Sequence, residues 1–431
     1  MSLSNLQNPA HDALGSNAPI SRYQKLVLAS AFLGWMFDSM DLNLFTLILV
    51  PCIAELAATT DPAQIARLGG YVIAVKLFAW GIGGILFGVA ADRFGRAKVM
   101  AITIIIYSVF TGLSAFAQSV TQLAIFQAFA GLGIGGEWAA GAALVAETWP
   151  ARHRAKAIQI MQMAFAFGFF AAALDNLLLG PLGWRWVIAV GVLPAVLTVF
   201  IRRWIPEPQV WVESASLERS SGERVPSRLA EIFRPPLVRG TVVGVVIAST
   251  AMIGSWGGLT LLPSMVQQMV KTGSAGLSAK DAVSYSFMLM MLGATAGYLS
   301  LAFLSAYLGR RLCYFLFWSG AFLVSIYVFT EVNRLDDWLL WMPVYGFFVI
   351  GGFGTFATYL PELFPTRVRA TGQGFCWNMA RLITGLGPIS IGILLHQFGS
   401  FAGVATALST IFLLGLVVVW FGPETRGRNL Q

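Results

Sequence analysis

Apolar residues gather along the chain in long blocks that short polar segments separate. A helix needs roughly 20 apolar residues to cross about 30 Å of hydrocarbon, and in lipid a helix satisfies its own backbone groups. Twelve blocks reach this length, at residues 26–51, 69–90, 98–117, 121–147, 156–180, 184–204, 238–269, 283–307, 311–330, 338–361, 371–395 and 400–421. The pattern therefore predicts an all-α integral membrane protein with twelve transmembrane helices.

The composition leads to the same class. Of the 431 residues, 57% are hydrophobic and only 11% are charged, whereas soluble domains average about 25% charged residues. So little charge cannot cover a surface in water, which excludes the soluble classes. The formal net charge of +8 is attributed to orientation in the membrane, and no nucleic-acid partner is expected.

The lysines and arginines predict the orientation. Alternate connections, together with both tails, hold most of these cations, including seven arginines between residues 202 and 239. The opposite side holds only Arg67, Arg185, Lys271, Lys280 and Arg334. Because cations gather on the cytoplasmic side, both termini are predicted to be cytoplasmic. The predicted order is a tail (1–25), a six-helix bundle (26–204), a cytoplasmic linker (205–236), a second six-helix bundle (237–421) and a tail (422–431).

One loop sequence occurs twice. The segments "AETWPARHRAK" and "PELFPTRVRAT" share Glu, Pro, Arg and Arg at a spacing of 215 residues, as Glu147, Pro150, Arg152 and Arg154 and as Glu362, Pro365, Arg367 and Arg369. "GVAADRFGRAK" from Gly88 is echoed by "AFLSAYLGRRL" from Ala302, and "IPEPQVW" from Ile205 by "GPETRGRNL" from Gly422. Duplicated membrane halves imply a binding site between them near the midplane, which opens alternately to either side.

With these loops the chain resembles the major facilitator superfamily over essentially its full length. "GVAADRFGRAK" is similar to the family's signature loop between helices 2 and 3, which it matches at Gly88, Asp92, Arg93, Gly95 and Arg96. The resemblance implies a cytoplasmic gate, in which Asp92 pairs with arginines and with a helix N-terminus when the gate is shut. The repeated loops are assigned to the same gate through Glu147, Arg152, Arg154, Glu362, Arg367 and Arg369.

Charge-assisted bonds of this kind can break as the two halves rock. A static positive anchor on the cytoplasmic side is the alternative interpretation of the signature loop. The second copy carries Ala306 and Tyr307 where Asp and Arg would stand, which predicts a weaker latch in that half.

Away from their ends, the apolar blocks contain six charged residues, and charge at such depth is costly and indicates function: Asp38, Asp41, Lys76, Glu137, Asp175 and Arg381. Asp38 and Asp41 are three residues apart, so they share one helix face. Two carboxylates so close in low dielectric disfavour joint ionisation, so one should hold a proton, as proton-coupled symport requires. Alternatively, one aspartate pairs permanently with Lys76 or Arg381. Glu137 is interpreted either as a second proton site or as a hydrogen-bonded packing residue.

Three segments resemble the organic acid branches of the superfamily. "DSMD" is similar to the Asp-Gly-x-Asp motif of aromatic acid and organic acid proton symporters, with Ser39 in place of the glycine. "SWGGLTLLP", which contains Trp256, and "NMARLITGLGP", which contains Asn378 and Arg381, resemble helices 7 and 11 of organic, sialic acid and lactate carriers. The resemblance implies that Arg381 binds the substrate's carboxylate and that Lys76 assists. Alternatively, Arg381 is a counter-ion for Asp175 or Asp41.

A sugar porter is the rival interpretation. Gln162 and Gly168 follow Arg154 as in the sugar porters' helix 5, where a glutamine binds hydroxyl groups, and "PETRGRNL" resembles their C-terminal signature. Helix 7 lacks the Gln-Gln and Asn residues of sugar porters, however, and a neutral sugar would leave Arg381 without an anionic partner. We therefore predict an organic anion as the substrate.

Other classes are disfavoured. A sensor with the same fold would usually carry a long cytoplasmic tail, and no nucleophile with a placed base indicates an enzyme. His11, His153 and His396 stand apart on a tail, a loop and a helix end, so no metal site is predicted. No ATPase-type phosphate loop is present, so no cofactor is expected and energy should come from an ion gradient.

The prediction is a monomeric symporter in the cell membrane, with an organic anion and protons as partners and Asp38, Asp41 and Glu137 in proton coupling. Arg381, Lys76, Gln162, Asp175, Trp256 and Asn378 are the predicted substrate residues.

Overall fold

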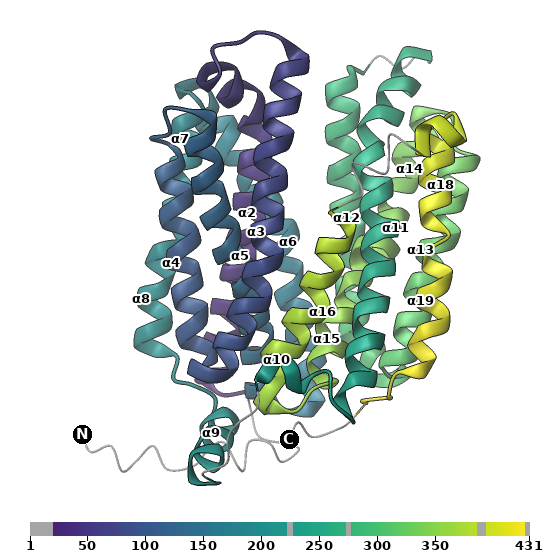
Figure 1. Ribbon diagram of the computed structural model, residues 1–431. Helices are drawn as coiled ribbons and strands as arrows, with labels where there is room; N and C mark the ends of the chain where they lie inside the picture. The colour runs from purple at the N-terminus through teal and green to yellow at the C-terminus, as the bar shows by residue number, and fades with distance from the viewer. Residues whose placement is uncertain (1–19, 222–226, 273–276, 386–393, 427–431) are drawn as a thin grey trace.

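The computed structural model describes residues 20–221, 227–272, 277–385 and 394–426, and within these ranges it is helical without strands. The helices form two bundles that stand side by side (Figure 1). The first contains α2 (Arg22–Leu56), α3 (Pro62–Phe94), α4 (Arg96–Ser114), α5 (Val120–Thr148), α6 (Ala151–Leu179), η2 (Gly180–Leu182), α7 (Trp184–Ala189), η3 (Val190–Val192) and α8 (Pro194–Trp204).

The second bundle is built in the same way. It contains α11 (Leu237–Thr272), α12 (Ala279–Leu308), α13 (Arg310–Thr330), α14 (Leu335–Tyr345), η4 (Gly346–Ile350), η5 (Gly351–Phe353), α15 (Gly354–Glu362), η6 (Thr366–Val368), α16 (Arg369–Thr384), α18 (Phe401–Ser409), α19 (Phe412–Val418) and η7 (Val419–Phe421). The short helices α9 (Gln209–Ser221) and α10 (Arg228–Glu231) lie between the bundles in sequence and at one end of the molecule in space (Figure 1).

Ten helical stretches of the described chain are long and apolar enough to cross a membrane. The predicted block 184–204 is instead divided into α7, η3 and α8, and Pro194 begins α8 because proline is tolerated at the first turn of a helix. The predicted block 371–395 is seen as α16, which begins at Arg369, while residues 386–393 lie outside the described ranges. The structure thus divides three of the twelve predicted blocks, 184–204, 338–361 and 400–421, into shorter helical segments, and it describes only part of block 371–395.

Helix α2 is longer than its apolar block at both ends. Its N-terminus is fixed by a capping box, in which Ser21 Oγ accepts from the Gln24 backbone N–H and the Gln24 side chain accepts from the Ser21 N–H. This end lies beside the linker, because Tyr23 Oη donates to the Pro206 carbonyl at 2.8 Å. The start of α2 and the end of η7 therefore lie at the end of the molecule that carries α9 and α10 (Figure 1).

Glycines let α3 and α5 pack backbone against backbone. A Cβ atom at Gly131 would lie 2.3 Å from the Lys76 carbonyl oxygen, and one at Gly135 would lie 2.1 Å from that of Trp80. No side chain fits at these distances, so only glycine allows so close an approach, as is common where membrane helices pack. The close contact fixes α5, with Glu137 and Trp138, against the helix that carries Lys76 and Trp80.

Candidate functional site

The cytoplasmic ends of the two bundles are joined through Asp92, at the end of α3. Its carboxylate accepts hydrogen bonds from the backbone N–H groups of Ala370 (3.1 Å) and Thr371 (2.6 Å), at the N-terminus of α16. Arg96 Nη2 lies 2.7 Å from the same carboxylate. A negative charge at a helix N-terminus is stabilised by the unpaired N–H groups and the helix dipole. Gly88 allows the approach, because a Cβ there would lie 2.7 Å from the Ala370 carbonyl oxygen.

Glu147 is the second bridge between the bundles. It binds Arg96 Nη2 of its own bundle at 3.1 Å and Arg369 Nη1 of the other at 2.8 Å, and all three side chains are fully buried. Arg96 also donates to the Thr366 carbonyl at 2.5 Å. Three charged groups are thus bonded to one another in a site without water access, where such bonds are strong and an unpaired charge is costly.

The repeat partner of Glu147 is held differently. Glu362 binds Arg310 through Nε and Nη2, each at 2.8 Å, and accepts from Thr425 Oγ1 at 2.6 Å, all within the second bundle. Its link to the first bundle is Arg154, whose Nη1 lies 4.0 Å away. The two copies of the repeat therefore have the same residues but unequal links across the bundle interface.

The remaining predicted gate residues lie at the rim. Arg93 is exposed and stacks over Phe94 at 5.4 Å, and Arg152 is also exposed. Arg367 forms an ion pair with Glu231 of α10, which ties the linker to the second bundle. These residues surround the buried bridges of Asp92 and Glu147.

Two glutamates that the sequence analysis did not single out cap the helices after the signature loops. Glu207 accepts from the backbone N–H groups of Ala97 (3.2 Å) and Lys98 (2.9 Å), and Glu424 accepts from those of Arg310 (2.9 Å) and Arg311 (3.2 Å). Burial alone would raise the pKa of Glu424, but these and two further backbone N–H groups lower it below its ordinary value. The matched segments "IPEPQVW" and "GPETRGRNL" could have indicated this role, since each has a glutamate directly after a proline.

A second pair that the sequence did not reveal lies deeper. Gln159 on α6 donates to the Gly354 carbonyl (2.7 Å), and Gln373 on α16 donates to the Ala139 carbonyl (2.5 Å). Both bonds join the two bundles, and Ala139 and Gly354 are themselves 215 residues apart, as in the repeat. Together with the gate residues, these amides hold the bundles together on the cytoplasmic side.

Above this level, Asp38 and Glu137 meet in the interior. Both side chains are buried, and their carboxyl groups are close enough to interact electrostatically. Gly34 makes the space, because a Cβ there would lie 2.1 Å from Glu137 Oε1. Within the described chain, none of the four oxygens of these two carboxyl groups has a hydrogen-bond partner, so both groups are buried and unpaired.

Arg381 of the second bundle is the nearby positive charge. Its charge and that of Asp38 are close enough to interact. Its Nη1 donates to Asn378 Oδ1 at 2.8 Å, and its guanidinium carbon lies 3.8 Å from the centre of the Trp80 ring. The cation–π contact and the amide hold the guanidinium in place, and neither of these partners is an anion that would neutralise its charge.

Asp41 does not join this group. It is bound to Lys76 Nζ at 2.7 Å and accepts from Thr111 Oγ1 at 2.5 Å, and all three side chains are buried. Asp38 and Asp41 share a buried region of α2, as their spacing predicted, but Asp41 is bound to Lys76 whereas Asp38 lies near Glu137. The ammonium group of Lys76, predicted to assist substrate binding, is occupied by Asp41 in this structure.

An aromatic cluster surrounds the interior site. Trp138 of the first bundle stacks on Trp377 of the second, with ring centroids 4.8 Å apart and planes at 19°. Trp35 lies against Trp138 at 6.4 Å, and Phe353 against Trp377 at 5.7 Å. Gln162 accepts from Trp138 Nε1 at 3.1 Å. The indole N–H groups of Trp35 and Trp377 are buried without a hydrogen-bond partner in the described structure.

Two further predicted substrate residues, Asp175 and Trp256, are less buried than the interior charges. Asp175 is thirteen residues beyond Gln162 on α6, about 20 Å along the helix axis, and it is only half-buried. Trp256 is 42% exposed, and its neighbour Gly257 packs against Leu408. The described part of the chain contains no group of three or more His, Cys, Asp and Glu residues placed to hold a metal ion.

We expect the ion pair of Asp41 and Lys76 to contribute to stability rather than to transport. Asp41→Asn leaves a buried ammonium group without its counter-charge, which should lower the free energy of unfolding by about 3–5 kcal/mol. The double variant Asp41→Asn/Lys76→Met removes both charges and should recover most of that loss. Thermal unfolding in detergent measures both effects. A double variant that is no more stable than Asp41→Asn would contradict a structural ion pair.

Residues 31–388 match the Major Facilitator Superfamily profile. The chain belongs to this superfamily. It is 33% identical over 423 residues to a probable 4-methylmuconolactone transporter of Cupriavidus pinatubonensis, with 95% of this chain and 93% of that protein covered. It is 28% identical over 443 residues to a niacin transporter of Acinetobacter baylyi, with 96% and 97% covered.

Among solved structures, the proton:xylose symporter XylE bound to 6-bromo-6-deoxy-D-glucose is similar, with a TM-score of 0.77, 18% identity, and 96% of this chain and 98% of that one covered. The predicted major facilitator fold, family and membrane location are thus confirmed. The family and the named relatives are membrane transporters and not enzymes, so this chain is a multi-pass membrane transporter.

Proposed function

We propose that this transporter takes up a small organic anion together with at least one proton. The observation that carries the proposal is the placement of two buried, unpaired carboxyl groups, those of Asp38 and Glu137, near the guanidinium of Arg381. The carboxyl pair is the proton site, and Arg381 is the site for the substrate's carboxylate. Asn378 and Trp80 orient the guanidinium so that its remaining N–H groups can grip two carboxylate oxygens.

Charge balance links the two ligands. One guanidinium can neutralise one negative charge, and an ionised Asp38 already interacts with Arg381. An incoming carboxylate would therefore face a second negative charge, and at about 4 Å and an effective dielectric constant of about 20 such a repulsion is worth about 4 kcal/mol. A proton on the carboxyl pair removes it. Anion binding and proton binding thus favour one another, and by linkage the effect is reciprocal.

The closed cytoplasmic side supports binding from outside. Asp92, Glu147, Gln159 and Gln373 all bond across the bundle interface there. A substrate would reach Arg381 from outside, and the cytoplasmic bonds would have to break for its release.

The substrate class is supported by the relatives and by the site. Two of the relatives are named as a niacin transporter and a probable 4-methylmuconolactone transporter, and an anion gives Arg381 a partner that a neutral sugar would not. The likeness to the xylose symporter, at 18% identity, shows the fold alone. Gln162, the residue that favoured a sugar, is bonded to Trp138.

Uptake into proteoliposomes under an imposed pH gradient tests the proposal, with niacin, benzoate and xylose as labelled probes. We expect an acidic exterior to drive accumulation of a carboxylate but not of xylose. Asp38→Asn should abolish the response to the gradient, because the pair can no longer exchange its proton. Asp336→Asn, at a side chain that is 80% exposed, is the control and should keep it. Carboxylate uptake that ignores the gradient would refute coupling, and accumulation of xylose alone would refute the substrate class.

A further inference from the structure

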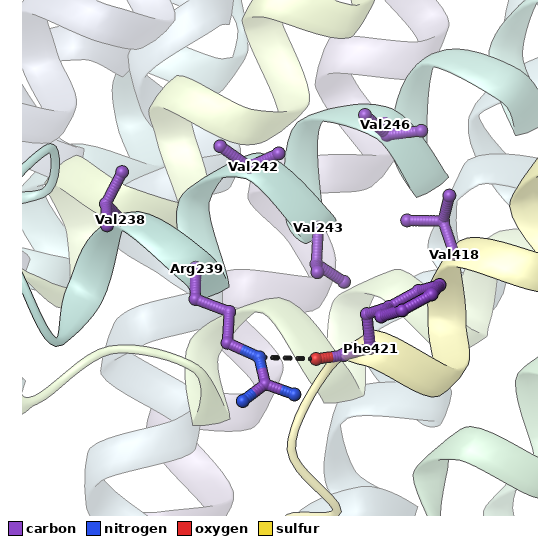
Figure 2. Close-up of a pocket in the computed structure, with 7 residues that line it drawn as sticks. All are labelled: Val238, Arg239, Val242, Val243, Val246, Val418 and Phe421. Carbon is purple, nitrogen blue, oxygen red and sulfur yellow. Dashed lines mark hydrogen bonds between the residues drawn. The ribbon is translucent and has the colours of Figure 1, made fainter.

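An apolar groove opens on the outside of the second bundle, where α11 begins and α19 runs into η7 (Figure 2). Its volume is about 470 Å³. One wall is a row of four valines on the first turns of α11, namely Val238, Val242, Val243 and Val246, and Val418 and Phe421 form the other wall. The valine row extends about 12 Å along the helix axis.

Arg239 is the charged residue of this groove. Its Nε donates to the Phe421 carbonyl at 2.8 Å, which fixes the guanidinium at the mouth (Figure 2). In the described chain neither of its terminal nitrogens has a hydrogen-bond or ion-pair partner. The carboxylate of Glu424, three residues beyond Phe421, is engaged by four backbone N–H groups. The guanidinium therefore offers a fork of free donors that suits a phosphate group.

The groove has the position of a lipid site. It faces outward from the bundle, and Val242 and Phe421 are 54% and 59% exposed. Both helix ends that form it are cytoplasmic ends, so Arg239 lies at the level of the lipid headgroups of the inner leaflet and the valines lie deeper in the hydrocarbon. An acyl chain along the valines and a phosphate on Arg239 would satisfy the apolar wall and the free donors together.

We propose that this groove binds one anionic phospholipid of the cytoplasmic leaflet. The headgroup charge selects the lipid, because a zwitterionic lipid brings its own cation next to the arginine. The site is independent of the substrate site, since it lies on the outer face of the second bundle and uses none of the interior charges.

Native mass spectrometry of the detergent-purified protein tests this, with phosphatidylglycerol and phosphatidylcholine of identical acyl chains. We expect the first phosphatidylglycerol to bind more tightly than phosphatidylcholine. Arg239→Gln should weaken phosphatidylglycerol about fivefold, the effect of one cation at an anionic surface, and leave phosphatidylcholine unchanged. Val242→Trp should fill the groove and weaken both lipids.

Arg22→Gln is the matched control. Arg22 lies over the Trp204 ring at 5.9 Å at the cytoplasmic end of the first bundle, and it lines no part of this groove. Its loss should leave the first phosphatidylglycerol unaffected, and Arg239→Lys should keep most of the preference if charge rather than folding is responsible. Equal binding of the two lipids would overturn the proposal, and so would an equal loss of phosphatidylglycerol binding in Arg22→Gln and Arg239→Gln. Either result would mean that lipid binds to the surface without a specific site.

Discussion

Arg381→Ala is expected to reduce carboxylate uptake at least about 100-fold. The change removes a charge-assisted bond worth about 1.5–3 kcal/mol to the substrate, and it also leaves the buried carboxyl pair of Asp38 and Glu137 without its nearby positive charge. Arg381→Lys keeps the charge but loses the planar fork, so it should retain part of the activity. Initial rates in proteoliposomes and binding of niacin to the purified variants measure the effect.

A double variant separates the two roles of Arg381. In Arg381→Gln/Asp38→Asn both charges are gone, so the interior is again neutral and the protein should be about as stable as the wild type. If Arg381 binds the substrate, the double variant still fails to bind a carboxylate. If Arg381 is only a counter-ion for Asp38, binding returns, and that result would overturn the assignment of the anion site.

Glu147→Gln is expected to open the cytoplasmic side. It removes the charge that holds both Arg96 and Arg369, and breaking a buried network of this kind costs about 3–5 kcal/mol. Since one of its bonds crosses the interface, part of that cost falls on the closed state. We expect a longer distance between spin labels at Phe94 and Tyr307, which are exposed on the two bundles. The three native cysteines are buried, so they should not react with the spin label.

The repeat supplies the control for this experiment. Glu362→Gln removes the carboxylate that pairs with Arg310, so it should also lower the thermal stability. Its bond to the first bundle is long, however, and the distance between the labels should change little. Equal opening in both variants would show that the distance reports loss of stability and not the bridge of Glu147.

The gate illustrates how far a motif can lead. The signature loop implied that Asp92 meets arginines and a helix N-terminus, and the structure places it on the N-terminus of α16. The repeat also matched Glu147 with Glu362, but it could not reveal that their links across the interface differ. That difference depends on where Arg154 and Arg369 lie once the bundles pack, and it is not encoded in the local pattern.

The two aspartates of α2 show what spacing along a single helix cannot predict. Their spacing placed Asp38 and Asp41 on one helix face, and both are indeed buried in the bundle. Asp41 is bound to Lys76, the pairing that stood as the alternative, and Asp38 lies near Glu137. The sequence named every one of these charges, since charge inside an apolar block is conspicuous, but spacing along α2 says nothing about α3 and α5.

By itself, the sequence determined the twelve apolar blocks, the duplicated halves and the short set of interior charges, because block length, repetition and the cost of buried charge are properties of the linear chain. The tertiary structure decided which charge meets which: Glu137 with Asp38, Lys76 with Asp41, and Arg381 with Asn378 and Trp80. It also decided the bridges of Gln159 and Gln373. These contacts join residues far apart in sequence, and their geometry is set by close glycine packing and by the docking of two bundles, which no local pattern contains.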